Sequence, residues 1–186
     1  MKLLLTAVVL LSPLAACGDD GATAPATTSA TTTSTTTTGA ATVEVTAVDY
    51  AYEHLPSEVA AGAAVTLRNA SEAEVHELVG WLLPADEERS PEELMALPEE
   101  EIGALLDGPP DIGLVALPGE DGTIVSGDGT FAEPGRYLVF CAIPTGATTA
   151  DVQAAMADAE QSDGPPVIPG GPPHFTAGMF GEVEVS

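Results

Sequence analysis

The chain has 186 residues, enough for one ordinary domain with additional segments. Its formal net charge is −25, because Lys2, Arg68, Arg89 and Arg136 are its only lysines and arginines. Nucleic-acid backbones are bound by clustered cations, so this composition argues against nucleic acid as a partner and favours a basic protein. Aromatic residues make up 4% of the chain, and we therefore expect a core of valine, leucine, isoleucine and alanine.

Residues 1–16 have the features of an export signal. Lys2 supplies the positive start, and residues 3–11 form an apolar run that is too short to span a bilayer. The run ends in Leu-Ala-Ala before Cys17, which resembles a bacterial lipobox. We expect a lipoprotein signal peptide over 1–16 and a lipid on Cys17 that anchors the exported protein to the extracytoplasmic face of the membrane. The alternative is an ordinary secretory signal followed by a free cysteine.

Residues 17–42 are expected to form a tether that begins with the lipidated Cys17. The segment from 18 to 42 contains eleven threonines and no large apolar side chain, so it cannot bury enough surface to fold. A flexible chain of this length reaches roughly 25–30 Å, enough to hold a domain clear of a membrane surface. If Cys17 carries the lipid, Cys141 has no partner for an intramolecular disulfide.

A folded domain is expected from residue 43 to residue 186. Alternation of apolar and polar residues predicts strands over 43–52, 63–69 and 74–83. In the third of these strands, a period of two places His76 on the same face as Leu78 and Leu82, so its ring should point inward.

The segment from about 85 to 111 reads as a helical insertion. Ser90, Pro91 and Glu93 have the pattern of a capping box with proline at the first helical position, and Gly108 is a plausible stop. The segment contains ten acidic residues against Arg89 alone. Such a face is either a solvated surface or a docking site for a basic partner.

Strands are predicted again over 112–117, 123–126, 136–141 and 180–185. A second insertion, at about 144–172, contains a helix that starts near 148–151 and a proline-rich return loop. Short strands separated by glycine and proline turns predict an all-β sandwich with short helical insertions.

Candidate metal ligands occur in a characteristic order. Asn69 at a strand end is followed by His76; a Pro-Gly-Arg-Tyr-Leu-Val-Phe-Cys run then ends at Cys141; and His174 is followed by Met179. This order over residues 43–186 resembles the cupredoxins, or blue copper proteins. Taken one at a time, these residues are more often core or rim side chains than ligands.

The resemblance implies a Greek-key β-sandwich that holds one type 1 copper and passes single electrons. His76 and His174 would be the imidazole ligands, Cys141 the thiolate and Met179 the axial thioether. Thiolate and thioether suit Cu(I) and imidazole suits both oxidation states. Pro173, Phe175 and Phe180 are candidates for the apolar surround. We expect a monomeric electron carrier rather than an enzyme, with a basic redox protein as a candidate partner.

One departure from the family pattern leaves alternatives open. Residues 142–173, thirty-two in all, separate Cys141 from His174, where cupredoxins usually have only a few. Added loop length costs little free energy, so His174 can still return to Cys141. The insertion could also cap the site, occlude it or accompany loss of the metal. The alternatives are therefore a metal-free binding module and a copper storage or delivery protein. His54 fits no family position and is expected at the surface.

Overall fold

The computed structural model describes residues 41–162 and 165–186. The expected signal peptide, Cys17 and nearly all of the expected tether lie outside these ranges. The described strands and helices, in chain order, are β1 (Thr42–Val48), β2 (Ala51–Glu53), β3 (Glu58–Val59), β4 (Ala63–Asn69), β5 (His76–Leu82), α1 (Pro91–Met95), α2 (Glu99–Leu105), β6 (Ile112–Ala116), β7 (Thr123–Ser126), β8 (Thr130–Phe131), β9 (Gly135–Phe140), α3 (Thr149–Ser162), the 3-10 helix η1 (His174–Ala177) and β10 (Phe180–Val185). No helix among the described residues is long and apolar enough to cross a membrane.

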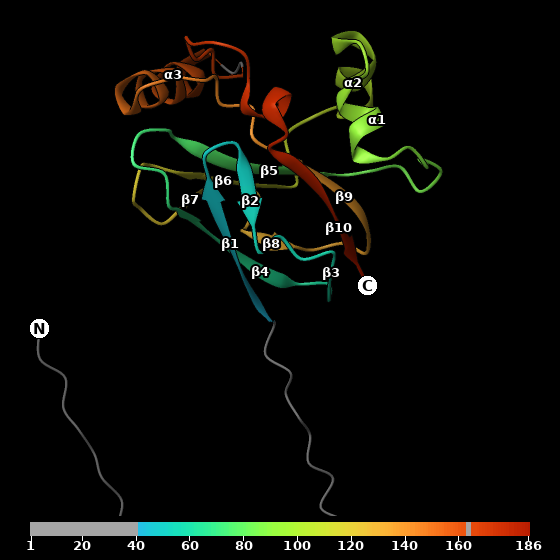
Figure 1. Cartoon of the computed structure of the whole chain (residues 1–186). Coiled ribbons are helices and arrows are strands. Elements are labelled where there is room, and N and C mark those ends of the chain that lie inside the picture. Colours follow the sequence, from blue (N-terminus) through green and yellow to red (C-terminus); the bar gives the residue numbers. More distant parts are fainter. Residues whose placement is uncertain (1–40, 163–164) are drawn as a thin grey trace, which may run out of the picture. The chain divides into compact units, whose positions relative to one another are not determined.

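The strands form two sheets that pack face to face (Figure 1). The smaller sheet has the order β2-β1-β4-β8, and the larger has the order β3-β10-β9-β5-β6-β7. Strands that are neighbours in a sheet are often distant in the chain, so the chain crosses repeatedly between the sheets, as in a Greek-key arrangement. The expected all-β sandwich with short helical insertions is confirmed.

The central strands of the larger sheet are buried on both faces. In β9, Tyr137 and Val139 point into the core between the sheets, whereas Leu138 and Phe140 point to the opposite, outer face. The outer face packs against the segment that contains α1 and α2, where Leu94 is fully buried. The predominance of aliphatic residues in both clusters agrees with the composition.

The prediction of one strand over 43–52 is wrong. The chain turns at Asp49 and Tyr50, and β2 pairs antiparallel with β1, with Val48 opposite Ala51. Tyr50, the second of the two turn residues, has a φ of 62°, the left-handed conformation that tight turns use at this position. Alternation did not reveal the turn because each arm of a hairpin keeps the same period of two. The short strands β3 and β8 were also not predicted, whereas β4 and β10 have the predicted bounds.

Both helical insertions form. Ser90 Oγ accepts a hydrogen bond from the Glu93 amide and the Glu93 carboxylate accepts one from the Ser90 amide, so the capping box is confirmed. The second helix of this insertion ends at Leu105, before the expected stop at Gly108. In α3, Val152 and Ala155 are buried.

Candidate metal site

Three of the four predicted ligands meet in the core. The Nδ1 atoms of His76 and His174 lie 3.1 Å apart, and Cys141 Sγ lies 3.4 Å from His174 Nδ1. One donor atom from each residue lies within 4.8 Å of the others. All three side chains have no exposed surface. The structure therefore contains a compact, solvent-inaccessible cluster of two imidazoles and a thiol.

Neighbouring strands position His76 and Cys141. His76 is the first residue of β5, and Cys141 directly follows β9, which pairs with β5. The Glu77 amide donates a hydrogen bond to Cys141 Sγ over 3.3 Å. The strand pairing thus fixes these two ligand candidates before any metal is bound.

The long insertion leaves and returns at the same point. The His174 amide donates to the carbonyl of Ile143 over 3.0 Å, and the Phe175 amide donates to the carbonyl of Cys141 over 2.9 Å. Pro144 and Pro173 form a bridge between the two ends. The 32 intervening residues therefore do not separate His174 from Cys141, because hydrogen bonds close the base of the loop.

Met179 lies beside Cys141 along the backbone. Its carbonyl accepts a hydrogen bond from the Cys141 amide over 3.0 Å, and its side chain is fully buried in the core cluster that contains Cys141. The preceding Gly178 has a φ of 106° and ends η1, which turns the chain into β10. The axial role of Met179 stays a prediction.

Burial governs the protonation of the cluster. It lowers the pKa of His76 to about 4, with a further contribution from the nearby His174, and it lowers the pKa of His174 against the opposing influence of Glu74. Burial raises the pKa of the Cys141 thiol, so without a metal the cysteine is protonated. The Nε2 atoms of both histidines are buried without a hydrogen-bond partner. Neutral imidazoles whose nitrogens face a thiol fit one metal ion that displaces the thiol proton.

Glu74 lies next to His174 and was not predicted. Its Oε2 atom is 3.5 Å from His174 Nε2 and accepts a hydrogen bond from the Gly146 amide over 3.1 Å. Its other oxygen is 3.5 Å from the Tyr50 hydroxyl, and the Tyr50 and His174 rings form a T-shaped pair with centroids 5.0 Å apart. Although the contact of Glu74 with His174 is too poorly aligned to count as a hydrogen bond, it places a carboxylate where a histidine ligand commonly has one.

Glu77 is a second residue that sequence reasoning missed. Its carboxyl group is buried and accepts a hydrogen bond from the Ala142 amide over 2.8 Å. Burial raises its pKa to about 7, although the Ala142 amide opposes the shift. An acidic residue inside an otherwise apolar strand was the available signal. Glu77 ties the strand that begins with His76 to the segment that follows Cys141.

Asn69 supports the loop before His76. Its amide donates to the carbonyls of Glu74 and Ala116, and its oxygen accepts from the Ser71 amide. The apolar surround differs from the prediction, because Phe175 and Phe180 pack in the outer cluster rather than around the ligands. They are chain neighbours of His174 and Met179, so their side chains take the opposite direction. His54 is exposed, as expected.

The donor set identifies the class of site. Two imidazoles and a cysteine thiol, brought together in the buried core with a buried methionine next along the chain, are the donor set of a type 1 copper centre. This agrees with the ligand order that suggested a cupredoxin.

Comparisons with known proteins give likenesses only among solved structures. No family model matches the sequence, and no curated protein matches it. Reduced auracyanin from Roseiflexus castenholzii is 21% identical with a TM-score of 0.41, over 80% of this chain and 99% of that one. Auracyanin B is 19% identical with a TM-score of 0.38, over 79% and 89%. Auracyanin A, described as a "blue" copper protein from Chloroflexus aurantiacus, is 16% identical with a TM-score of 0.41, over 80% and 100%. The chemistry of the site therefore has to be inferred from its own geometry.

Proposed function

We propose that this protein binds one copper ion through His76, Cys141 and His174, with Met179 as the weak axial ligand, and transfers single electrons. The convergence of the three buried donor atoms is the observation that carries this proposal. Such a donor set suits both Cu(I) and Cu(II), so little rearrangement accompanies electron transfer. The Glu77 amide on Cys141 Sγ would tune the reduction potential.

The burial of the cluster favours an electron carrier over the other candidates. A catalytic metal keeps an open position for substrate, whereas all three donor residues here have no exposed surface. Copper delivery requires ligand exchange with a receiving protein, which the same burial opposes. An electron, in contrast, can leave a buried centre without any ligand becoming accessible.

We also propose that the protein is exported and held at the extracytoplasmic face of the membrane by a lipid on Cys17. The support is the sequence of residues 1–17 and the composition of the following tether. Mass spectrometry of the protein from the membrane fraction should show a lipid on Cys17 as the first residue. A Cys17→Ser variant should be released from the membrane, and an unmodified wild-type cysteine would contradict the anchor.

Copper titration of the full chain tests the central proposal. Cu(II) should bind once and produce an intense visible thiolate-to-copper band that Cys141→Ser abolishes. Met179→Leu should shift the band or the potential, whereas Met95→Leu, in a methionine of α1 outside the ligand cluster, should not. A colourless wild-type protein without stoichiometric copper would overturn the proposal. Tight Cu(I) binding without a reversible voltammetric wave would indicate storage instead.

A further inference from the structure

The candidate ligands cannot touch a partner directly. All three are fully buried, and His174 is covered by the Tyr50 ring, by Glu74 and by the loop whose Gly146 amide binds Glu74. If the site carries copper, as proposed above, electrons must leave through side chains next to the ligands. The ligand set alone does not show at which surface the electrons leave, so that surface has to be found from the packing around the ligands.

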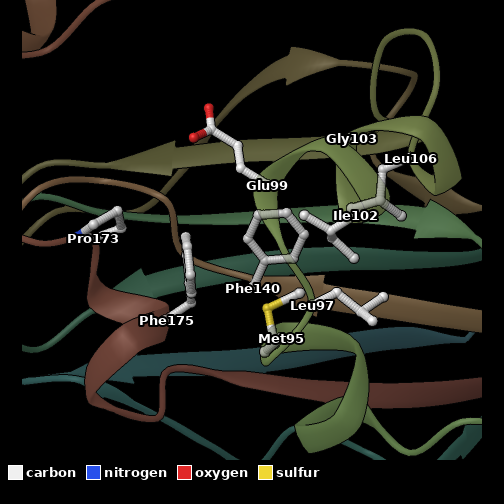
Figure 2. Close-up of a pocket in the computed structure, with 9 residues that line it drawn as sticks. All are labelled: Met95, Leu97, Glu99, Ile102, Gly103, Leu106, Phe140, Pro173 and Phe175. Atoms are coloured by element: carbon white, nitrogen blue, oxygen red, sulfur yellow. The ribbon is translucent and has the colours of Figure 1, made fainter.

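An apolar groove lies one residue from two of the ligands. It has a volume of about 550 Å³ and lies between the α1–α2 segment and the outer face of β9 (Figure 2). Its lining residues are Met95, Leu97, Glu99, Ile102, Gly103, Leu106, Phe140, Pro173 and Phe175. Phe140 precedes Cys141 and Phe175 follows His174 in the chain. Two aromatic walls of the groove are therefore covalently joined to candidate ligands.

Three aromatic rings form a continuous row that includes the two aromatic walls of the groove. Phe140 and Phe175 meet edge to face with centroids 5.8 Å apart, and Trp81 stacks on Phe140 at 5.3 Å with an interplanar angle of 8°. Figure 2 shows the Phe140 and Phe175 rings side by side, facing the apolar side chains of the α1–α2 segment. Peptide bonds join Phe140 to Cys141 and Phe175 to His174, so the ring contacts connect the ligand residues to the groove.

The charge around the groove specifies its occupant. Exposed carboxylates lie on the two helices beside it: Glu92 and Glu93 on α1, and Glu99, Glu100 and Glu101 on α2, of which Glu99 lines the groove. Each arginine in the described part of the chain is already paired: Arg68 with Asp121, Arg89 with Glu87 and Arg136 with Glu182. Arg89 lies near Glu93 and Glu101, but it is paired with Glu87. The helices therefore carry an excess of negative charge, which complements a partner rich in lysine or arginine.

We propose that this groove, and not the His174 end of the sandwich, is the electron-exchange surface, and that its occupant is a basic redox protein. The partner places an apolar side chain against Phe140 and Phe175, while its cations face the carboxylates of α1 and α2. With copper held as proposed above, one electron would pass from the reduced site to the oxidised centre of the partner. No bond breaks and no proton moves.

Stopped-flow oxidation of the copper-loaded full chain by a ferric, lysine-rich c-type cytochrome tests the proposal. A Cβ on Gly103 would meet no atom within 4 Å, so Gly103→Phe can fill the groove without distorting α2. We expect its second-order rate constant to fall about tenfold or more. Ala104→Phe, an exposed neighbour on the same helix that does not line the groove, is the matched control and should keep the wild-type rate.

A charge variant gives a second, independent measurement. Glu100→Lys should slow the reaction and weaken its dependence on ionic strength, because electrostatic attraction steers association. Asp158→Lys, at an exposed acid on α3, makes the same charge change away from the groove and should have a smaller effect. Ala73→Phe, next to Glu74 and Tyr50, tests the His174 end and should leave the rate unchanged.

The outcomes separate this proposal from the copper proposal. Absence of the visible band in the wild-type protein would remove the copper site itself. An intact band and voltammetric wave in Gly103→Phe, together with an unchanged rate, would overturn the groove alone. A rate that falls only in Ala73→Phe would assign exchange to the His174 end. A wild-type dimer that Gly103→Phe makes monomeric would show that a second copy fills the groove, which also overturns the proposal.

Discussion

The two faces of the larger sheet have opposite properties although the same strands form both. The inner face ends in a sealed cluster in which His76, Cys141 and His174 have no exposed surface. The outer face ends in an open groove bounded by Phe140 and Phe175. Successive residues of a strand point to opposite faces, so one pair of neighbours supplies both a buried ligand and a groove wall. Metal ligation needs dryness and partner docking needs access, and this alternation provides both within two residues.

Truncation of Phe140, on the outer face, should show most clearly that stability and copper binding depend on different faces. Phe140→Ala should lower the free energy of unfolding by about 3–5 kcal/mol, because the ring is buried between Trp81 and Phe175. The copper band should persist, because the ligands lie on the inner face. Urea unfolding of the copper-free protein and copper titration measure the two effects. Ile124→Ala, at a half-exposed side chain, is the control. Loss of the band in a folded Phe140→Ala protein would show that the faces are coupled.

Glu77→Gln should change how the stability of the inner site depends on pH. The pKa of Glu77 is about 7 in the folded protein against an ordinary 4.5, so the folded state holds a proton that the unfolded state has lost. This group therefore destabilises the copper-free protein as pH rises from 4.5 to 7, by about 3 kcal/mol in total. The pKa of His76, about 4 against 6.5, has the opposite sign and stabilises the protein as pH rises through that window.

The Glu77→Gln variant should consequently gain about 3 kcal/mol over the wild type at pH 8 and little at pH 4. Chemical denaturation of the copper-free proteins across this range measures the difference. Glu58→Gln, at an exposed carboxylate, should run parallel to the wild type. If the stability of Glu77→Gln also follows that of the wild type across this pH range, the Glu77 carboxyl group ionises freely and water reaches the inner face.

Glu74→Gln tests the carboxylate that lies next to His174. The variant retains an oxygen for the Gly146 amide but removes the negative charge next to His174 Nε2. Loss of such a partner should weaken copper binding about 10- to 100-fold. Competition with a chelator measures the affinity, and nitrogen NMR of His174 reports which ring nitrogen carries the proton. Glu72→Gln changes an exposed neighbour and should have no effect. An unchanged affinity and tautomer would exclude Glu74 as a partner of the ligand.

The pH dependence of copper binding should be the smallest of these effects when it is counted per pH unit. Burial raises the pKa of the Cys141 thiol and lowers the pKa of both histidines, so near neutral pH copper displaces one proton, from the thiol. The apparent affinity should therefore rise about tenfold per pH unit between pH 6 and 8. Calorimetry in buffers of different ionisation enthalpy counts the released protons. Release of no proton would mean that the thiol is already ionised in its buried site.

Much of the scaffold could be predicted because its signals are local. Alternation located β4 and β10 with their observed bounds, and Ser90 with Glu93 located the start of α1. The hairpin turn at Tyr50 could not be predicted, because the alternation of apolar and polar residues continues through it. The direction of the Phe175 side chain could not be predicted either, since it depends on how η1 packs against the outer face rather than on residue spacing in the sequence.

The sequence by itself determined the two-layer β architecture, the acidic surface and the ordered donor types at 76, 141, 174 and 179. Those properties follow from residue type and from periodicity along the chain. Only the tertiary structure decided whether the donors meet, because the hydrogen bonds that close the 32-residue insertion join residues distant in sequence. It also decided that Glu74 covers His174 and that the groove opens beside Phe140. These depend on packing between separate segments, and no local pattern encodes such packing.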